Sequence, residues 1–164
     1  MSKPKSPQPL LLVVRIRGTL NVRRDMKSTL ESLRVRKIHS ATLLRYRPDV
    51  LGALQQVKDL VTWGEIDEAT LVKLLERRAR LVGDRAVTEQ YLVNKLNARD
   101  FPTLAKSLIN YEMDLTDLPG VKPFFRLSPP KKGYGLKLDR SRKGKVRISG
   151  YVGKAINEFA LRMI

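Results

Sequence analysis

The first stretch with a regular pattern is LLLVVRIRG, residues 10–18, which is apolar on both sides at its start and alternates toward its end. Positions 12, 14 and 16 are apolar and share one side of an extended chain, whereas the opposite side ends in Arg15 and Arg17. This pattern predicts a central strand that leaves the core at a basic surface. Gly18 is expected to end it.

Helical spacing and a second extended stretch predict the next two elements. In NVRRDMKSTLESLRV, apolar residues recur at intervals of four, four and three, which places them on one face of a helix. Asn21 is expected to cap the start of this helix. The following IHSATLLRYRP is apolar and β-branched enough for a strand that ends in Arg45 and Arg47, and Pro48 prevents its continuation.

The next segments complete a repeating order of strands and helices. Pro48 suits the first turn of a helix over DVLGALQQVKDL, and VTWGEI is predicted as a third strand with Trp63 in the core. Residues 10–66 are therefore expected to form a β-α-β-α-β core of the α+β class. Residues 1–9 would form a short basic leader.

Residues 67–118 are predicted to be a helical addition packed beside the sheet. Asp67 is a plausible cap for a helix through EATLVKLLERRARLV, whose apolar side is expected to run as far as Val82. Two shorter amphipathic segments follow, TEQYLVNKL and FPTLAKSLINYE. Their apolar residues recur at helical intervals, so each predicts a short helix.

Residues 119–164 are expected to pack on the same body. TDLPGVKPFFRLSPP carries four prolines, too many for a regular element, but enough apolar residues to lie against the core. The final GYVGKAINEFALRMI has Ile156, Phe159, Ala160 and Met163 at helical spacing. A C-terminal helix is therefore predicted.

The net charge of the chain and its distribution indicate a class of partner. The chain has 164 residues, 33 Lys plus Arg, 16 Asp plus Glu and a formal net charge of +17. The excess lies in the two ends, with 13 basic and 4 acidic residues in 1–64 and 12 and 2 in 119–164, whereas 65–118 holds 8 and 10. Such a field attracts polyanions, so a nucleic-acid face built by both ends is expected.

The most basic stretch is PPKKGYGLKLDRSRKGKVRISG, residues 129–150, with eight Lys or Arg and one Asp. It could be a disordered tail, a phosphate-binding loop of an enzyme or a clamp on a nucleic acid. Because a predicted helix follows it, we interpret it as a loop tethered at both ends. Its glycines would let backbone approach phosphates, and Tyr134 could stack on a base.

Catalytic and metal-binding patterns are not found. GYVGKA has the wrong spacing before its lysine for a P-loop, and His39 is the sole histidine in a chain without cysteine. Capping and helix-dipole effects explain Glu65, Asp67 and Glu68. We expect no enzyme activity, no cofactor, no metal and no small-molecule substrate.

The expected location is soluble and cytoplasmic. The longest apolar run, LLLVV, is too short to cross a bilayer, so no membrane partner is expected. The preceding residues lack the layout of a signal peptide.

Several segments in order resemble one family. They are LLVVRIRG, TLESLRVRKIHSATLLRY, LVTWGEI, FFRLSPPKKGYG and NEFALRMI, spread across nearly the whole chain. The chain resembles the large-subunit ribosomal protein L-thirty family in its longer archaeal form, which is related to eukaryotic L-seven. This resemblance implies a ferredoxin-like three-stranded sheet with two helices, a structural role in translation and large-subunit ribosomal RNA as partner. Neighbouring ribosomal proteins are further expected partners.

The predicted RNA contacts go mostly to phosphates and 2′-hydroxyls. They are Arg15, Arg17, Arg23, Arg24, Lys37, Arg45, Arg47, Lys131, Lys132, Tyr134, Lys137, Arg140, Arg142, Lys143, Lys145 and Arg147. Alternatives are a ribosome-biogenesis or other ribonucleoprotein factor, a DNA-binding chromatin protein and an RNA-modifying enzyme. The chain has no recognisable DNA-binding motif, which argues against a chromatin protein, and no cofactor loop, which argues against an RNA-modifying enzyme.

Overall fold

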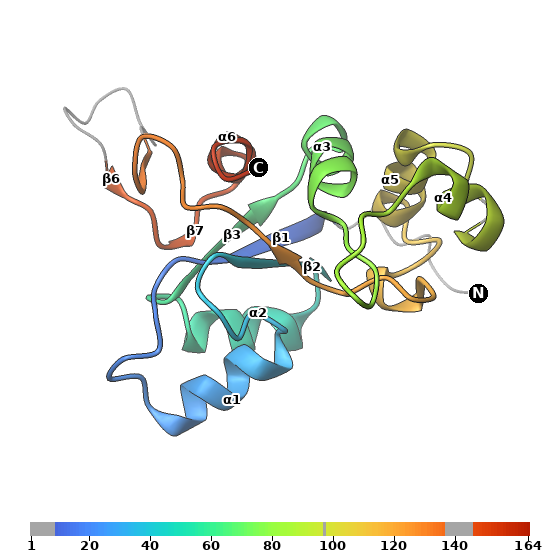
Figure 1. Ribbon diagram of the computed structural model, residues 1–164. Coiled ribbons are helices and arrows are strands. Elements are labelled where there is room, and N and C mark those ends of the chain that lie inside the picture. The colour runs from blue at the N-terminus through green and yellow to red at the C-terminus, as the bar shows by residue number, and fades with distance from the viewer. Residues whose placement is uncertain (1–8, 97, 137–145) are drawn as a thin grey trace, which may run out of the picture.

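The computed structural model describes residues 9–96, 98–136 and 146–164, and its first half follows the predicted β-α-β-α-β order (Figure 1). The elements of this core are β1 (Leu10–Arg15), α1 (Arg24–Ser32), β2 (Ser40–Arg45), α2 (Pro48–Gln56) and β3 (Val61–Glu65). Pro48 occupies the first turn of α2, as expected. The α+β class is confirmed.

Helices dominate the middle of the chain, and short strands dominate the last third. The middle holds α3 (Glu68–Arg78), α4 (Glu89–Leu96), α5 (Phe101–Ile109) and the 3-10 helix η1 (Leu115–Asp117). The last third holds β4 (Phe125–Arg126), β5 (Gly135–Leu136), β6 (Val146–Arg147), β7 (Gly150–Tyr151) and α6 (Ala155–Leu161). The helices expected in the middle and at the C-terminus are therefore present.

The main sheet has five strands in the order β4-β2-β1-β3-β7. β1 lies antiparallel between β2 and β3, so the connection through α2 crosses over β1. The expected three-stranded sheet is thus the centre of a wider one. β4 adds to β2 antiparallel and β7 adds to β3 parallel, each by two residues.

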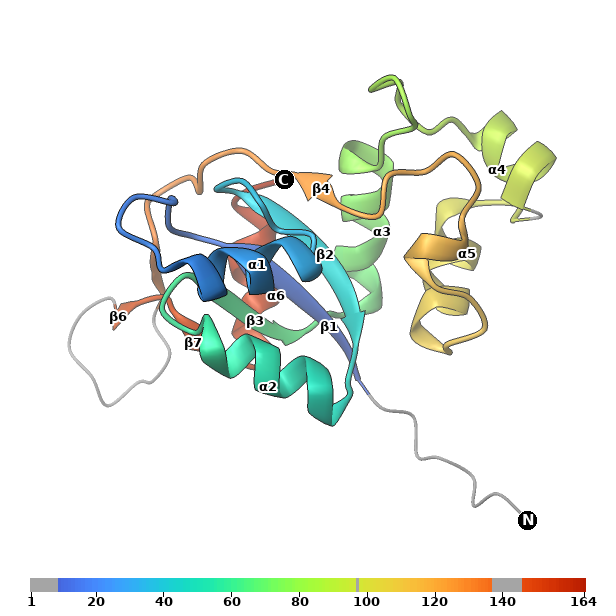
Figure 2. The ribbon, with the colours of Figure 1, turned by 90° about the horizontal axis from the view of Figure 1, so that it is seen from below.

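The sheet is covered on both faces (Figures 1 and 2). Leu11 and Val13 of β1 pack with α1 and α2 around Trp63, which is 2% exposed. Leu12 and Val14 pack on the opposite face, in a cluster that includes α3, α5 and α6. The alternation in the first strand therefore separates two cores, because successive strand residues point to opposite faces.

Two predicted details of the helices are wrong. Asn21 does not cap α1, since Arg23 occupies the cap position and Asn21 has a positive φ of 56° in the preceding turn. Val82 does not continue the buried side of α3, since the helix ends at Arg78 and Val82 is 75% exposed. The backbone becomes extended at Ala79, which turns the later residues away from the helix axis.

The C-terminal segment approaches β3 so closely that one position requires glycine. A Cβ atom on Gly64 would lie 2.0 Å from the carbonyl oxygen of Gly153, in the turn before α6. Backbone cannot yield as a flexible side chain can. The absence of a side chain on Gly64 therefore lets α6 cover this face of the sheet.

We expect Gly64→Ala to lower the free energy of unfolding by about 1–3 kcal/mol or more, because the added methyl group forces the backbones apart. Gly52→Ala is the matched control, since Gly52 lies inside α2 with no atom within 4 Å of its missing Cβ. It should stabilise the chain by up to about 1 kcal/mol. Urea unfolding measures the free energy of unfolding of both variants. An equal change in the two would show that the close approach of Gly64 to Gly153 does not limit this position.

Leu30→Ala should remove about 2–5 kcal/mol of stability, because a leucine in a packed core leaves a cavity when truncated. Leu30 is 1% exposed on α1, and Leu20 at 89% exposure supplies the control. Thermal denaturation should show a lower midpoint for Leu30→Ala and an unchanged midpoint for Leu20→Ala. An unchanged midpoint for Leu30→Ala would contradict the described packing of α1.

Candidate nucleic-acid interface

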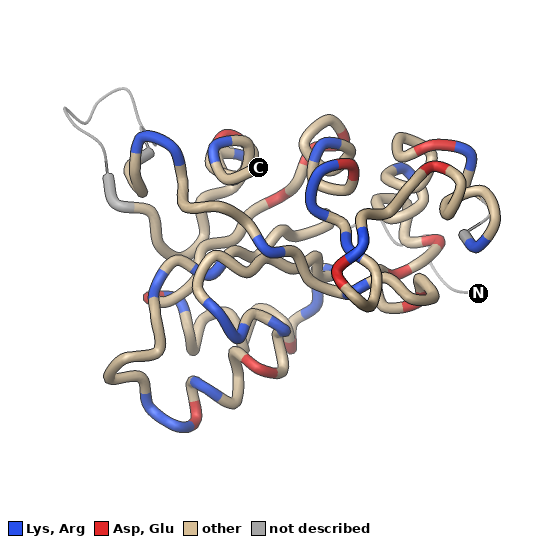
Figure 3. Tube along the Cα trace, in the orientation of Figure 1, with Lys and Arg blue, Asp and Glu red and all other residues tan. Residues whose placement is uncertain are grey.

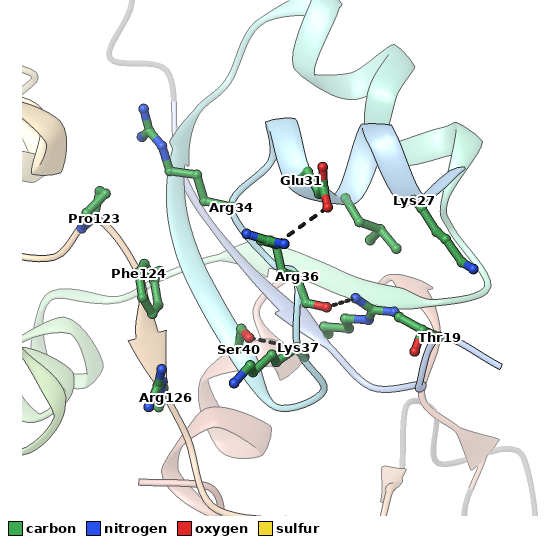
Figure 4. A pocket seen from close by; sticks show the side chains of 12 residues that line it. Thr19, Lys27, Glu31, Arg34, Arg36, Lys37, Ser40, Pro123, Phe124 and Arg126 are labelled. Carbon is green, nitrogen blue, oxygen red and sulfur yellow. Dashed lines mark hydrogen bonds and ion pairs between the residues drawn. The ribbon is translucent and has the colours of Figure 1, made fainter. Parts of the chain in front are cut away.

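Basic side chains gather around α1 and the turn that joins it to β2. They border a cleft of ≈ 700 Å³ whose lining includes Lys27, Arg34, Arg36, Lys37 and Arg126 (Figure 4). All five are exposed. Glu31 is the single acidic residue in the described lining, and its nearest carboxylate oxygen is 3.5 Å from Arg36 Nε. An exposed pair of this length is weak, so the cleft keeps a positive potential.

Arg15 contributes a buried cation to the same cleft and is only 1% exposed. Its Nε donates to the Arg17 carbonyl at 2.8 Å, and its Nη1 donates to the Val35 carbonyl at 3.1 Å and to that of Arg36. Burial lowers the pKa of this guanidinium. Arg15 was predicted to lie on the surface, but it holds the turn after α1 from beneath.

The guanidinium of Arg45 also donates hydrogen bonds within the protein. Its Nε donates to Asp114, its Nη2 donates to the Tyr111 carbonyl at 3.3 Å, and its guanidinium lies 4.8 Å from the centre of the Tyr111 ring. These contacts join the end of β2 to the segment after α5. Arg45 therefore connects the sheet to the helical region.

Tyr134 packs inward at the start of the basic stretch. Its hydroxyl lies 2.5 Å from His39 Nε2, and its ring centre is 6.0 Å from that of His39 and 6.4 Å from that of Phe159. Burial lowers the pKa of His39, which favours the neutral ring beside the hydroxyl. The ring predicted to stack on a base thus packs against the core.

Antiparallel pairing of β5 with β6 brings the two ends of the basic stretch together. Gly135 pairs with Arg147 and Leu136 with Val146. In addition, Lys131 N–H donates to the Arg162 carbonyl at 3.0 Å, next to α6. Both ends are therefore held near the body, as a tethered loop requires.

The remaining predicted contacts divide into three groups. Exposed residues are Arg17, Arg23, Arg24, Lys37, Arg47, Lys131 and Lys132. The structure places the backbone of Arg147 in β6. The predictions outside the described residues are Lys137, Arg140, Arg142, Lys143 and Lys145.

Sequence reasoning missed most of the cleft. Of its lining cations only Arg15 and Lys37 were predicted, whereas Lys27, Arg34, Arg36 and Arg126 were not. The signal was present in RVRK at 34–37, three cations in four residues between a predicted helix and a predicted strand. Figure 3 shows basic residues on α1 and on the segment that joins it to β2, and both acidic and basic residues along α3 and α4.

Archaeal ribosomal proteins are similar to this chain over nearly its whole length. The chain is 42% identical over 156 residues to "Large ribosomal subunit protein uL30" of Thermofilum pendens, covering 94% of this chain and 99% of that protein. The protein of the same name from Nanoarchaeum equitans is 40% identical over 155 residues, covering 94% and 99%. The chain belongs to the ribosomal protein L30p/L7e family.

The L30p/L7e family model matches residues 11–61, which run from β1 to the start of β3. The uL30 protein of Methanopyrus kandleri is 40% identical over 152 residues, covering 91% of this chain and 100% of that protein. The likeness therefore extends through the helical and C-terminal parts. The expected family is confirmed.

The described residues hold neither a cluster of metal ligands nor a membrane-spanning helix. Within residues 9–96, 98–136 and 146–164, no three His, Asp or Glu side chains come together as metal ligands would. None of the described helices is long and apolar enough to cross a bilayer. Glu65 at the end of β3 accepts a hydrogen bond from the Tyr151 hydroxyl at 2.5 Å.

We expect Arg15→Lys to reduce the free energy of unfolding by about 1–3 kcal/mol, because an ammonium cannot reach all three carbonyls and leaves buried acceptors unpaired. Arg17→Lys is the control, since Arg17 is exposed two residues away. Urea unfolding should separate the two variants. Equal stability would show that Arg15 does not hold the turn.

Proposed function

We propose that this L30p/L7e protein is a structural constituent of the large ribosomal subunit that binds and stabilises ribosomal RNA. The main support is the concentration of exposed cations around α1 and the turn from α1 to β2, with a single acidic residue in the described cleft lining. The relatives' name, large ribosomal subunit protein, supports the location in that subunit. A structural, non-catalytic role follows from the family.

Binding would be electrostatic and would depend on RNA shape. Phosphate contacts dock a rigid domain without reading sequence, and wide RNA minor grooves offer 2′-hydroxyls to the same donors. Arg15 and Arg45 are left out of this exposed docking surface because Arg15 is buried beneath it and Arg45 donates to Asp114 and to the Tyr111 carbonyl. The proposed docking residues are Arg17, Arg23, Arg24, Arg34, Arg36, Lys37 and Arg47.

The basic stretch at 129–150 would supply a second set of contacts. Lys131 and Lys132 are exposed at its start, and the β5–β6 pairing returns the chain to the body. A loop held at both ends loses less conformational entropy on binding than a free tail of equal length. We propose that this stretch reaches between RNA helices while the globular part docks beside it.

A ribosome-biogenesis factor with the same domain is the second candidate. The same basic surface would serve either role. What separates them is whether the protein stays in mature particles.

Sedimentation of a native lysate through a density gradient tests the role. We expect the protein to travel in stoichiometric amounts with mature large subunits and translating ribosomes, at moderate and at high salt. Mass spectrometry of the fractions measures it against the RNA profile. Presence only with precursor particles, or release at moderate salt, would favour the biogenesis factor.

Replacing Lys131, Lys132, Arg142 and Lys143 together by Ala should weaken binding to naked large-subunit RNA and leave folding intact. If each contacts a phosphate, the log–log salt slope should become shallower by roughly three, at about 0.7–0.9 per contact. Filter binding at several salt concentrations measures this slope.

The matched control removes four other exposed cations, Lys73, Arg77, Arg85 and Lys95, from the region of mixed charge around α3 and α4. Net charge falls equally in both variants, so a general field effect would change both slopes alike. An unchanged slope in the first variant would exclude the basic stretch from the RNA contact.

A further inference from the structure

The buried guanidinium of Arg15 is not fully satisfied by the protein. Three backbone carbonyls accept from its Nε and Nη1, whereas its Nη2 is buried with no hydrogen-bond partner among the described residues. No Asp or Glu in the described part of the chain forms an ion pair with it. A buried cation without a counter-ion is costly, so an anion in the adjoining cleft would stabilise it.

The two walls of the cleft differ in chemistry (Figure 4). On one side, α1 and the turn after it present Lys27, Arg34, Arg36 and Lys37. On the other side, the segment leading into β4 presents Pro123 and the half-buried ring of Phe124, followed by Arg126. Cations facing an aromatic ring can bind a phosphate and a base at once.

The wall that carries Phe124 is held in place by the sheet. Arg126 pairs with Ser40 and Phe125 pairs with Ala41 in the β2–β4 ladder. In addition, Thr42 Oγ1 donates to the Pro123 carbonyl at 3.2 Å. Since Arg15 holds the opposite turn through Val35 and Arg36, both walls are preformed.

We propose that this cleft binds one unstacked nucleotide of RNA, with its base against Phe124 and its phosphate facing Arg36 and Lys37 above the buried charge of Arg15. The volume of ≈ 700 Å³ accommodates a nucleotide, since small-molecule pockets span about 300–1,000 Å³. This inference rests on the proposed function and names a single-stranded site within it. Binding of a duplex backbone would use the cations but would leave the aromatic wall of the cleft without a partner, because the bases of a duplex are stacked inside it.

The test uses the full chain bound to large-subunit ribosomal RNA, with ultraviolet cross-linking and peptide mapping. We expect a nucleotide joined to the peptide that contains Phe124. Phe124→Ala should abolish this cross-link and weaken binding by about fivefold to a hundredfold, the usual range for a lost base stack. The salt slope should not change, because phenylalanine carries no charge.

Two matched variants separate stacking from packing and from charge. Phe124→Leu keeps apolar bulk without an aromatic face, so it should lose most of the affinity that Phe124→Ala loses while melting at the wild-type temperature. Lys37→Ala should instead make the salt slope shallower by about 0.7–0.9. Wild-type affinity and cross-linking in Phe124→Leu would overturn the proposed stacking.

The source of the nucleotide is tested by competition. A single-stranded oligoribonucleotide should displace the Phe124 cross-link, and adenosine monophosphate at the same phosphate concentration should not. Displacement by the mononucleotide alone would make this a free-nucleotide site and would overturn the RNA assignment.

Failure of this inference is distinguishable from failure of the proposed function. If the wild-type chain binds the RNA with a steep salt slope and Phe124 variants behave identically to it, the nucleotide site is wrong and the RNA-binding role stands. If the wild-type chain does not bind the RNA, both are wrong.

Discussion

The structure depends on the complete burial of β1 between two strands and two helical layers. All six residues of β1 are buried, and its backbone is paired on both sides with β2 and β3. Leu11 and Val13 face α1 and α2, whereas Leu12 and Val14 face the opposite cluster. A shift of one residue in register would exchange these faces, so the surrounding elements have one consistent arrangement.

Arg15 connects this buried strand to the basic surface. It is the last residue of β1, and its guanidinium donates to carbonyls of the turn that follows α1. That turn carries Arg34, Arg36 and Lys37 to the surface. A cation inside the fold therefore determines where three cations outside it stand, so the stability of the fold and the placement of this basic surface depend on one side chain.

The last third of the chain widens the sheet and completes its cover. β4 and β7 add one short strand to each edge, and α6 approaches β3 through the space that Gly64 leaves open. Arg45 links the same sheet to the helical region through Asp114 and Tyr111. Cations outnumber acidic residues in α1 and the turn that follows it, although Asp25 and Glu31 also lie on α1, and α3 and α4 likewise carry both signs (Figure 3).

Local pattern was sufficient for the helices and strands of the β-α-β-α-β core, but not for the short strands of the last third, of which β4 lies in the proline-rich segment expected to hold no regular element. Some features depend only on neighbouring residues and could be predicted directly from the sequence. They are the alternation around Leu12, the helical face of Leu30 and the position of Pro48. The excess of Lys and Arg likewise follows from composition, and it favours a polyanion whatever the fold. The helix cap at Asn21 was wrong because several nearby residues could begin the same helix.

Only the tertiary structure decided which basic and aromatic side chains are free to bind. Arg15 and Arg17 look equivalent along the strand, but the turn containing Val35 covers the first and leaves the second exposed. Tyr134 packs on His39, whereas Phe124 lines a cleft with residues about ninety positions earlier. Such outcomes depend on contacts between distant segments, which local periodicity does not encode.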